Sequence, residues 1–152
     1  PVGNKGLVIE KVDGPSHLKV VEEFGYEMYL HCGAIRKVLL AYQTPAFIDQ
    51  YFKTIIVNDQ AFPHVRPEDL KAELKKIRRD GYAITHGEYV NDAIGIGAPI
   101  FNSDGELAGS IGIIAPEIRI ETDDYLITLR ELVRRHAAGL SADMGYEARR
   151  IV

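Results

Sequence analysis

The sequence contains a single cysteine, Cys32, among its 152 residues. One cysteine excludes an internal disulfide framework and is typical of a protein in a reducing compartment. No apolar run is long enough to cross a bilayer, and no signal peptide opens the chain. We therefore expect a cytoplasmic protein without a membrane partner.

The chain also lacks an excess of basic residues. Its 18 lysines and arginines stand against 22 aspartates and glutamates, which gives a formal net charge of -4. A surface that binds duplex DNA normally carries a basic excess, so these residues alone are not expected to bind nucleic acid. The hydrophobic share of 46% and the charged share of 26% are ordinary for a globular protein. This length and composition indicate one domain.

Motifs for metal or cofactor chemistry are missing as well. None of the five histidines pairs with another at the i, i+4 spacing of a metal-binding helix, and no P-loop or G-x-S-x-G motif is present. We expect neither a metal nor a cofactor. An enzyme alternative remains at Cys32 and His31, because a following helix would lower the pKa of the thiol. A small buried side chain is the simpler interpretation of Cys32.

Hydrophobic periodicity predicts helices separated by strands in sequence-adjacent hairpins. The predicted helices span 33–42, 45–52, 67–80 and 122–138, with an irregular stretch over 53–65 and a weakly patterned tail from 141. The predicted strands are a first hairpin of 7–12 and 17–22, a short strand over 82–85, and a second hairpin within 93–113. This order favours an α+β domain with a mostly antiparallel sheet flanked by helices.

The second hairpin is unusual because one of its faces has almost no side chains. Ile94, Ile96, Ala98 and Ile100 form its apolar face with Ile111 and Ile113, and Asp104-Gly105 supplies the turn. The opposite face holds Gly95, Gly97, Ser110 and Gly112. Glycine weakens a strand, so these positions predict a close neighbour, which is a helix, another subunit or a ligand.

The helix that begins after Cys32 offers a candidate anion site. The backbone amides of Gly33, Ala34 and Ile35 stand at its N-terminus, where partial positive charge and unpaired donors suit a carboxylate. If this end faces the glycine-rich strands, the two features form a pocket with an anion end and an apolar floor. The alternative is that the glycines let the helix pack closely on the sheet.

Three stretches in this order, 30–42, 78–89 and 96–120, resemble the C-terminal effector-binding domain of IclR-type transcriptional regulators. The matching positions are His31, Lys37, Leu40-Ala41, Gly81-Tyr82, Glu88, Ala98-Pro99-Ile100, Asp104-Gly105 and Pro116. The resemblance implies a GAF-like fold that binds a small metabolite, in a homodimer or homotetramer. It also implies a fragment: the winged helix-turn-helix domain, through which alone the protein would contact DNA, and the start of the effector domain would precede residue 1.

The resemblance and the residue pattern together give a set of expected effector contacts. Gly33, Ala34 and Ile35 would hold the acid group, Gly95, Gly97 and Gly112 would form the floor, Thr85, Glu88 and Ser110 would offer polar contacts, and Met28 and Ile114 would form an apolar wall. On this view Gly112→Leu would abolish binding without unfolding the domain. The competing classes are the enzyme at Cys32 and His31 and a plain dimerisation module.

Several residues depart from the family pattern. Arg36 and Asp92 stand where glycine is usual, and Gly95, Gly112 and Ile114 stand where cysteine or serine is frequent. Fewer hydroxyls and more space predict a larger, partly apolar carboxylic effector, such as an aromatic acid.

Overall fold

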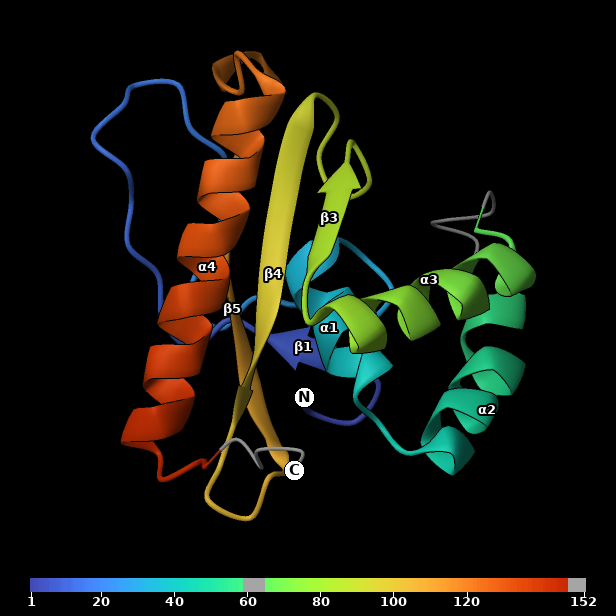
Figure 1. The fold of residues 1–152 in the computed structure, drawn as a ribbon. Coiled ribbons are helices and arrows are strands. Elements are labelled where there is room, and N and C mark those ends of the chain that lie inside the picture. Colours follow the sequence, from blue (N-terminus) through green and yellow to red (C-terminus); the bar gives the residue numbers. More distant parts are fainter. Residues whose placement is uncertain (59–64, 148–152) are drawn as a thin grey trace.

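An antiparallel sheet of order β3-β4-β5 lies at the centre of the fold (Figure 1). The computed structural model describes residues 1–58 and 65–147, and within them the sheet consists of β3 (Ala83–His86), β4 (Ala93–Phe101) and β5 (Leu107–Pro116). The α+β prediction with a mostly antiparallel sheet is confirmed.

The β4-β5 hairpin forms where the sequence predicted it. Its register pairs Gly97 with Gly112 and Pro99 with Ser110. At the turn, Gly105 has a φ of 78°, and the Asn102 side-chain oxygen accepts hydrogen bonds from the amides of Asp104 and Glu106. A left-handed residue is what a tight hairpin turn requires, which is why glycine stands there.

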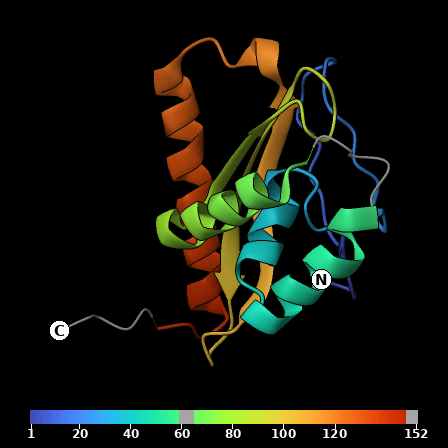
Figure 2. The same cartoon turned by 90° about the vertical axis from the view of Figure 1, so that its right-hand side faces the viewer.

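Two helices cover the two faces of this sheet. Helix α1 (Ala34–Ala41) lies on the glycine-rich face and α4 (Asp123–Asp143) lies on the isoleucine face, with the sheet between them (Figure 2). Ile96 and Ala98 are buried against Val133 and Ala137 of α4. Helix α4 begins at the predicted cap, where Thr122 Oγ1 accepts from the amide of Tyr125, but it continues beyond residue 138.

A second apolar cluster joins α1 to α2 (Pro45–Thr54), η1 (Ile56–Asn58) and α3 (Pro67–Asp80). Leu70, Leu74 and Ile77 are the buried side of α3, as the periodicity predicted. Gly81 ends that helix in the left-handed conformation and donates its amide to the Ile77 carbonyl oxygen at 2.8 Å. Residues 59–64 of the expected irregular stretch, and residues 148–152 of the tail, lie outside the described residues.

The predicted first hairpin is wrong. Strand β1 (Lys5–Leu7) pairs with β2 (Glu27–Tyr29), and residues 8–26 between them form neither helix nor strand; we call this segment the strap. Its apolar side chains, among them Val12 and Phe24, remain largely exposed. A two-stranded hairpin is marginally stable in water unless an apolar face packs against another element, and most apolar side chains of the strap have no such cover.

In the described part of the chain, no helix is long and apolar enough to span a membrane.

Candidate functional site

A small cavity lies between the start of α1, the glycine-rich strands and the loop after β3. It has a volume of about 20 Å³, which is room for about one water molecule. Seven of the predicted contact residues line it: Gly33, Ala34, Ile35, Thr85, Glu88, Gly95 and Ile114. Arg36, Tyr89, Val90, Ala93 and Ile94 complete the lining. The cavity is therefore too small for a metabolite in this structure.

The N-terminus of α1 is held by Thr85 of β3. Gly33 is the N-cap with a φ of 77°, and the next amide, of Ala34, donates to Thr85 Oγ1 at 3.1 Å. Thr85 is buried, and its hydroxyl lies 3.0 Å from the place that a Cβ on Gly95 would occupy. The hydroxyl therefore fills the space over Gly95 and satisfies one donor of the helix end.

Gly97 and Gly112 lie under α1 and do not line the cavity. A Cβ at Gly97 would lie 2.8 Å from Ile35 Cα. A Cβ at Gly112 would collide with the Ile96 carbonyl oxygen and lie 2.5 Å from Ile35 Cγ1. These two glycines thus permit close helix packing, and Gly112→Leu would disturb the fold, contrary to our expectation.

Ser110 and Met28 also lie away from the cavity. Ser110 Oγ donates to the Ile35 carbonyl oxygen at 2.9 Å, which ties β5 to α1. Met28 is half-buried in β2, where it pairs with Gly6. The structure thus gives these two residues roles in joining elements.

Glu88 reaches the cavity but is already engaged by Lys37. The Lys37 ammonium, buried in α1, donates to Glu88 Oε1 and to Glu73 Oε2, both at 2.7 Å. This arrangement joins the loop after β3, α1 and α3 around one cation. Lys37 matched the family pattern in the sequence, whereas its partner Glu73 gave no signal there.

Arg36 forms the other buried ion pair at the cavity. Its Nη2 donates to Glu22 Oε1 of the strap at 2.7 Å, and the two side chains are only 5% and 13% exposed. The guanidinium carbon lies 5.0 Å from the ring centre of Tyr89 and 6.0 Å from that of Tyr26. The sequence marked Arg36 only as a departure from the family and missed the other three residues.

The environment of Tyr89 keeps it protonated. Burial raises the pKa of its phenol to about 12, and the negative charge of Glu22 adds to this effect. Tyr89 therefore enters the site as a neutral aromatic ring.

Asp92, another departure from the family, has a φ of 57°. This left-handed conformation favours glycine, and aspartate is one of the few other residues that tolerate it. The backbone at the end of this loop explains why glycine is usual at that position.

His31 and Cys32 are buried before α1 and do not line the cavity. His31 Nδ1 lies 2.8 Å from the Tyr51 hydroxyl oxygen. Neither residue lines this cavity or the hollow beside the start of α4. Within residues 1–58 and 65–147, no group of three or more His, Cys, Asp and Glu side chains is placed to hold a metal ion.

A broader hollow of about 400 Å³ lies beside the start of α4. Its lining includes Glu117, Glu121 and Asp123, and His86 Nδ1 lies 2.6 Å from Glu117 Oε1. The three carboxylates would repel an anionic ligand, so this hollow does not suit a carboxylic acid.

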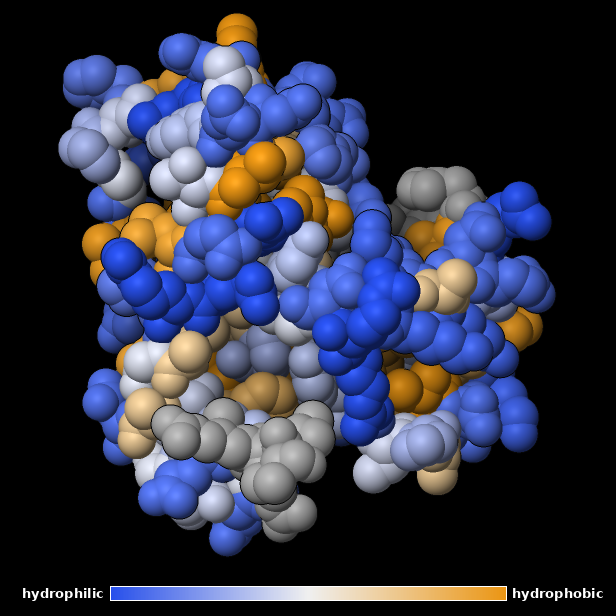
Figure 3. All heavy atoms as spheres, viewed as in Figure 1, coloured by the Kyte–Doolittle hydropathy of each residue, from blue (hydrophilic) through white to orange (hydrophobic). Residues whose placement is uncertain are grey.

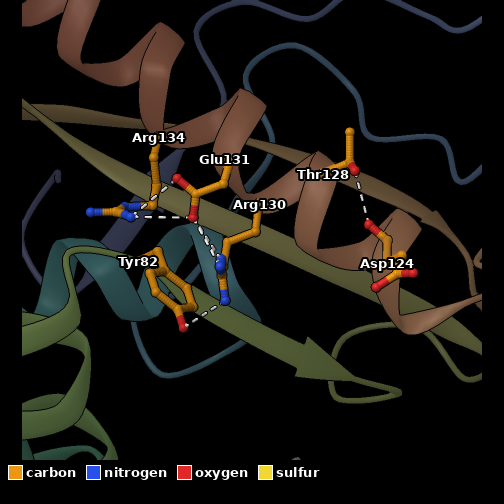
Figure 4. Close-up of polar contacts among 6 residues, drawn as sticks. All are labelled: Tyr82, Asp124, Thr128, Arg130, Glu131 and Arg134. Carbon is orange, nitrogen blue, oxygen red and sulfur yellow. Dashed lines mark hydrogen bonds and ion pairs between the residues drawn. The ribbon is translucent and has the colours of Figure 1, made fainter.

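Two arginines of α4 pair with one glutamate beside the end of α3. Hydrophilic side chains cover most of the face that carries α3 and α4 (Figure 3). Arg130 and Arg134 pair with Glu131 at 2.9 and 3.3 Å, and both guanidinium groups lie near the Tyr82 ring (Figure 4). Each of these two guanidinium groups thus has an ion-pair partner, although the two share one carboxylate.

The family model described as "Bacterial transcriptional regulator IclR C-terminal" matches residues 2–142. The chain is 30% identical over 145 residues to the HTH-type transcriptional regulator KipR of Bacillus subtilis, covering 95% of this chain and 58% of KipR. It is 34% identical over 122 residues to the HTH-type transcriptional regulator RhmR of Escherichia coli, covering 78% of this chain and 46% of RhmR.

Solved structures agree with the family match. The crystal structure of Thermotoga maritima IclR superposes with a TM-score of 0.85 at 26% identity, over 96% of this chain and 59% of that one. The C-terminal domain of a Vibrio cholerae transcriptional regulator gives 0.77 at 28% identity, over 92% and 81% of the two chains. The chain spans about half the length of the curated relatives it matches. The family consists of transcriptional regulators rather than enzymes, and this chain belongs to it as an IclR C-terminal domain.

Proposed function

We propose that this domain is the ligand-sensing part of an IclR-type DNA-binding regulator. A small organic acid would bind at the start of α1 and change the affinity of the whole protein for its operator, which a winged helix-turn-helix domain would contact. The match over residues 2–142 and the HTH-type relatives support this function. We further propose a cytoplasmic homodimer or homotetramer.

The observation that carries the proposal is the convergence of the α1 N-terminus, Thr85 and Gly95 on one cavity. The helix end favours negative charge. Val90, Ile94 and Ile114 give the cavity an apolar side, which favours an acid with an apolar body, such as an aromatic acid.

The small volume of the cavity fits a sensor better than a permanent binding site. About 20 Å³ cannot hold a metabolite, so binding requires a more open arrangement of the loop after β3 and the strap. A ligand that binds only the open form shifts the population toward it. Two states with different ligand affinities are what coupling to DNA binding needs.

A thermal-shift screen of the chain against carboxylic acids, from pyruvate to benzoate, tests the proposal. A ligand that prefers the native state raises Tm with concentration. Gly95→Ala is the matched test of location, because its Cβ would lie 3.0 Å from Thr85 Oγ1 and 3.4 Å from Ala34 Cβ. Gly109→Ala on the same hairpin is the control, because its Cβ would meet nothing within 4 Å. The shift should disappear in the first variant and persist in the second.

The packing of Gly97 and Gly112 under α1 favours a second candidate, a plain dimerisation module. On that view no acid would raise Tm, and the oligomeric state would be the same in Gly95→Ala and in the wild-type chain. A concentration-dependent shift that Gly95→Ala removes would exclude it.

A further inference from the structure

We propose that Arg36 binds the carboxylate of the effector and that Glu22 of the strap occupies this position when no effector is bound. The inference rests on the proposed function, since it assigns the acid group of that ligand to one side chain. It also gives a role to a residue that stands where the family usually has glycine.

Arg36 needs an anion in every well-populated state of the protein. Its side chain is 5% exposed, and a buried guanidinium without a counter-ion is strongly unfavourable. In this structure the only ion pair described for Arg36 within residues 1–58 and 65–147 is the one with Glu22. Any movement that withdraws Glu22 therefore has to bring another anion to Nη2.

The cation is fixed at the cavity rather than free to follow the strap. A Cβ on Gly6 would lie 3.0 Å from Arg36 Cγ, so β1 covers the aliphatic stem. The guanidinium lies 5.0 Å from the ring centre of Tyr89, which is outside the strap, and Arg36 belongs to the cavity lining beside Gly33 to Ile35. A ligand in the cavity would thus meet a positioned bidentate donor.

Glu22, in contrast, sits on a weakly anchored segment. The strap has neither helix nor strand, and its apolar side chains are mostly exposed. Its other described ion pairs, from Lys11 and Lys19 to Asp13, join strap residues to one another. The Glu22–Arg36 pair is therefore the charged contact that closes the strap onto the cavity.

Lys37, the other buried cation, is a poorer ligand site. Two carboxylates already contact its ammonium, so a third anion would add negative charge to a saturated position. At Arg36 the ligand carboxylate would replace a carboxylate, and the charge of the site would not change. Exchange at Arg36 selects acids over neutral isosteres and opens the strap in the same step.

Chemical rescue tests the exchange without knowledge of the effector. Glu22→Ala removes the atoms that acetate contains, so acetate should raise the Tm of this variant and restore at least half of the lost Tm. Acetamide, and sodium chloride at equal ionic strength, should not. The matched control is Glu23→Ala, since Glu23 is exposed and its side chain has no ion pair among the described residues. The double variant Glu22→Ala, Arg36→Gln should show no rescue; equal rescue by acetamide or in the double variant would overturn the proposal.

A second test uses the acids that raise Tm in the thermal-shift screen. Arg36→Gln should weaken their binding at least about tenfold, as expected for loss of a charged hydrogen bond, and binding to the wild-type chain should speed hydrogen exchange across 8–26. Equal affinity in Arg36→Gln refutes this inference alone and leaves the proposed function standing. If no acid binds the wild-type chain, the proposed function fails and the inference fails with it.

Discussion

The hydroxyl oxygen of Thr85 accepts a hydrogen bond from the backbone amide of Ala34, the first residue of α1, at 3.1 Å. This hydrogen bond holds the N-terminus of α1 against β3, which borders the cavity. We assign the same helix end to the ligand.

Thr85→Val keeps the shape of the side chain and removes this acceptor. We expect the free energy of unfolding to fall by about 1–2 kcal/mol, because a nearly buried amide loses its partner. Denaturant titration measures the change. Thr85→Ser retains the hydroxyl and serves as the control; equal stability of the two variants would show that the hydrogen bond contributes little.

Gly97→Ala should destabilise the domain by about 1–3 kcal/mol, since its Cβ would lie 2.8 Å from the backbone of Ile35. Gly109→Ala, where nothing lies within 4 Å, should be neutral or slightly stabilising. The melting temperatures of Gly97→Ala and Gly109→Ala, measured by thermal unfolding, test this difference. Similar melting temperatures would mean that α1 can shift away from the sheet.

Lys37→Met leaves Glu73 and Glu88 side by side without their shared cation. We expect a loss of about 1–3 kcal/mol, below the usual range for a buried pair because both carboxylates are about a third exposed. Lys75→Met, an exposed change on α3, is the control. An unchanged denaturation midpoint in Lys37→Met would argue against the bridge.

Tyr89 predicts a loss of stability in alkali. Its pKa is raised from 10.0 to about 12 in the folded domain, so above pH 10 the unfolded chain releases this proton first. The stabilisation that protonated Tyr89 gives the folded domain is complete below pH 10, and it disappears as the pH rises toward about 12. Melting temperatures across this range should fall more steeply for the wild-type chain than for Tyr89→Phe. If the melting temperatures of the two proteins fell in parallel with pH, the loss of stability would come from a group other than Tyr89.

Asp92 adopts a φ of 57°, so Asp92→Gly should raise the free energy of unfolding by a few tenths to about 1 kcal/mol. Asp92→Val should lower it, because a β-branched side chain is strained in that region. We expect the melting temperature to be highest with glycine at position 92, intermediate with aspartate and lowest with valine. A Val variant as stable as the Gly variant would contradict the conformation of this loop.

The sequence predicted those parts of the fold in which local pattern and tertiary environment agree. The stripe of Leu70, Leu74 and Ile77 is buried, and Asp104-Gly105 makes the turn between β4 and β5. The segment 7–12 is also rich in apolar residues, yet beyond Leu7 it forms no strand, and Ile9 and Val12 lie exposed. Whether another element covers such a segment is information that the segment itself does not hold.

The same reasoning separates the predicted from the missed site residues. The start of α1 and the glycine-rich strand β4 are evident from short stretches of sequence, so Ala34 and Gly95 were predicted as cavity residues. The ion pairs Arg36–Glu22 and Lys37–Glu73 join residues 14 and 36 positions apart. Charged side chains of both signs are common along this chain, and only the fold selects which of them meet.

The small volume of the cavity also has a consequence for the timing of the response. If the effector can enter only while the strap is open, its association rate at high concentration reaches a plateau set by the opening rate. The apparent dissociation constant then equals the intrinsic one divided by the fraction of open molecules. Substitutions at the Glu22 end of the strap would therefore change the concentration at which the sensor responds, while every group that touches the ligand stays the same.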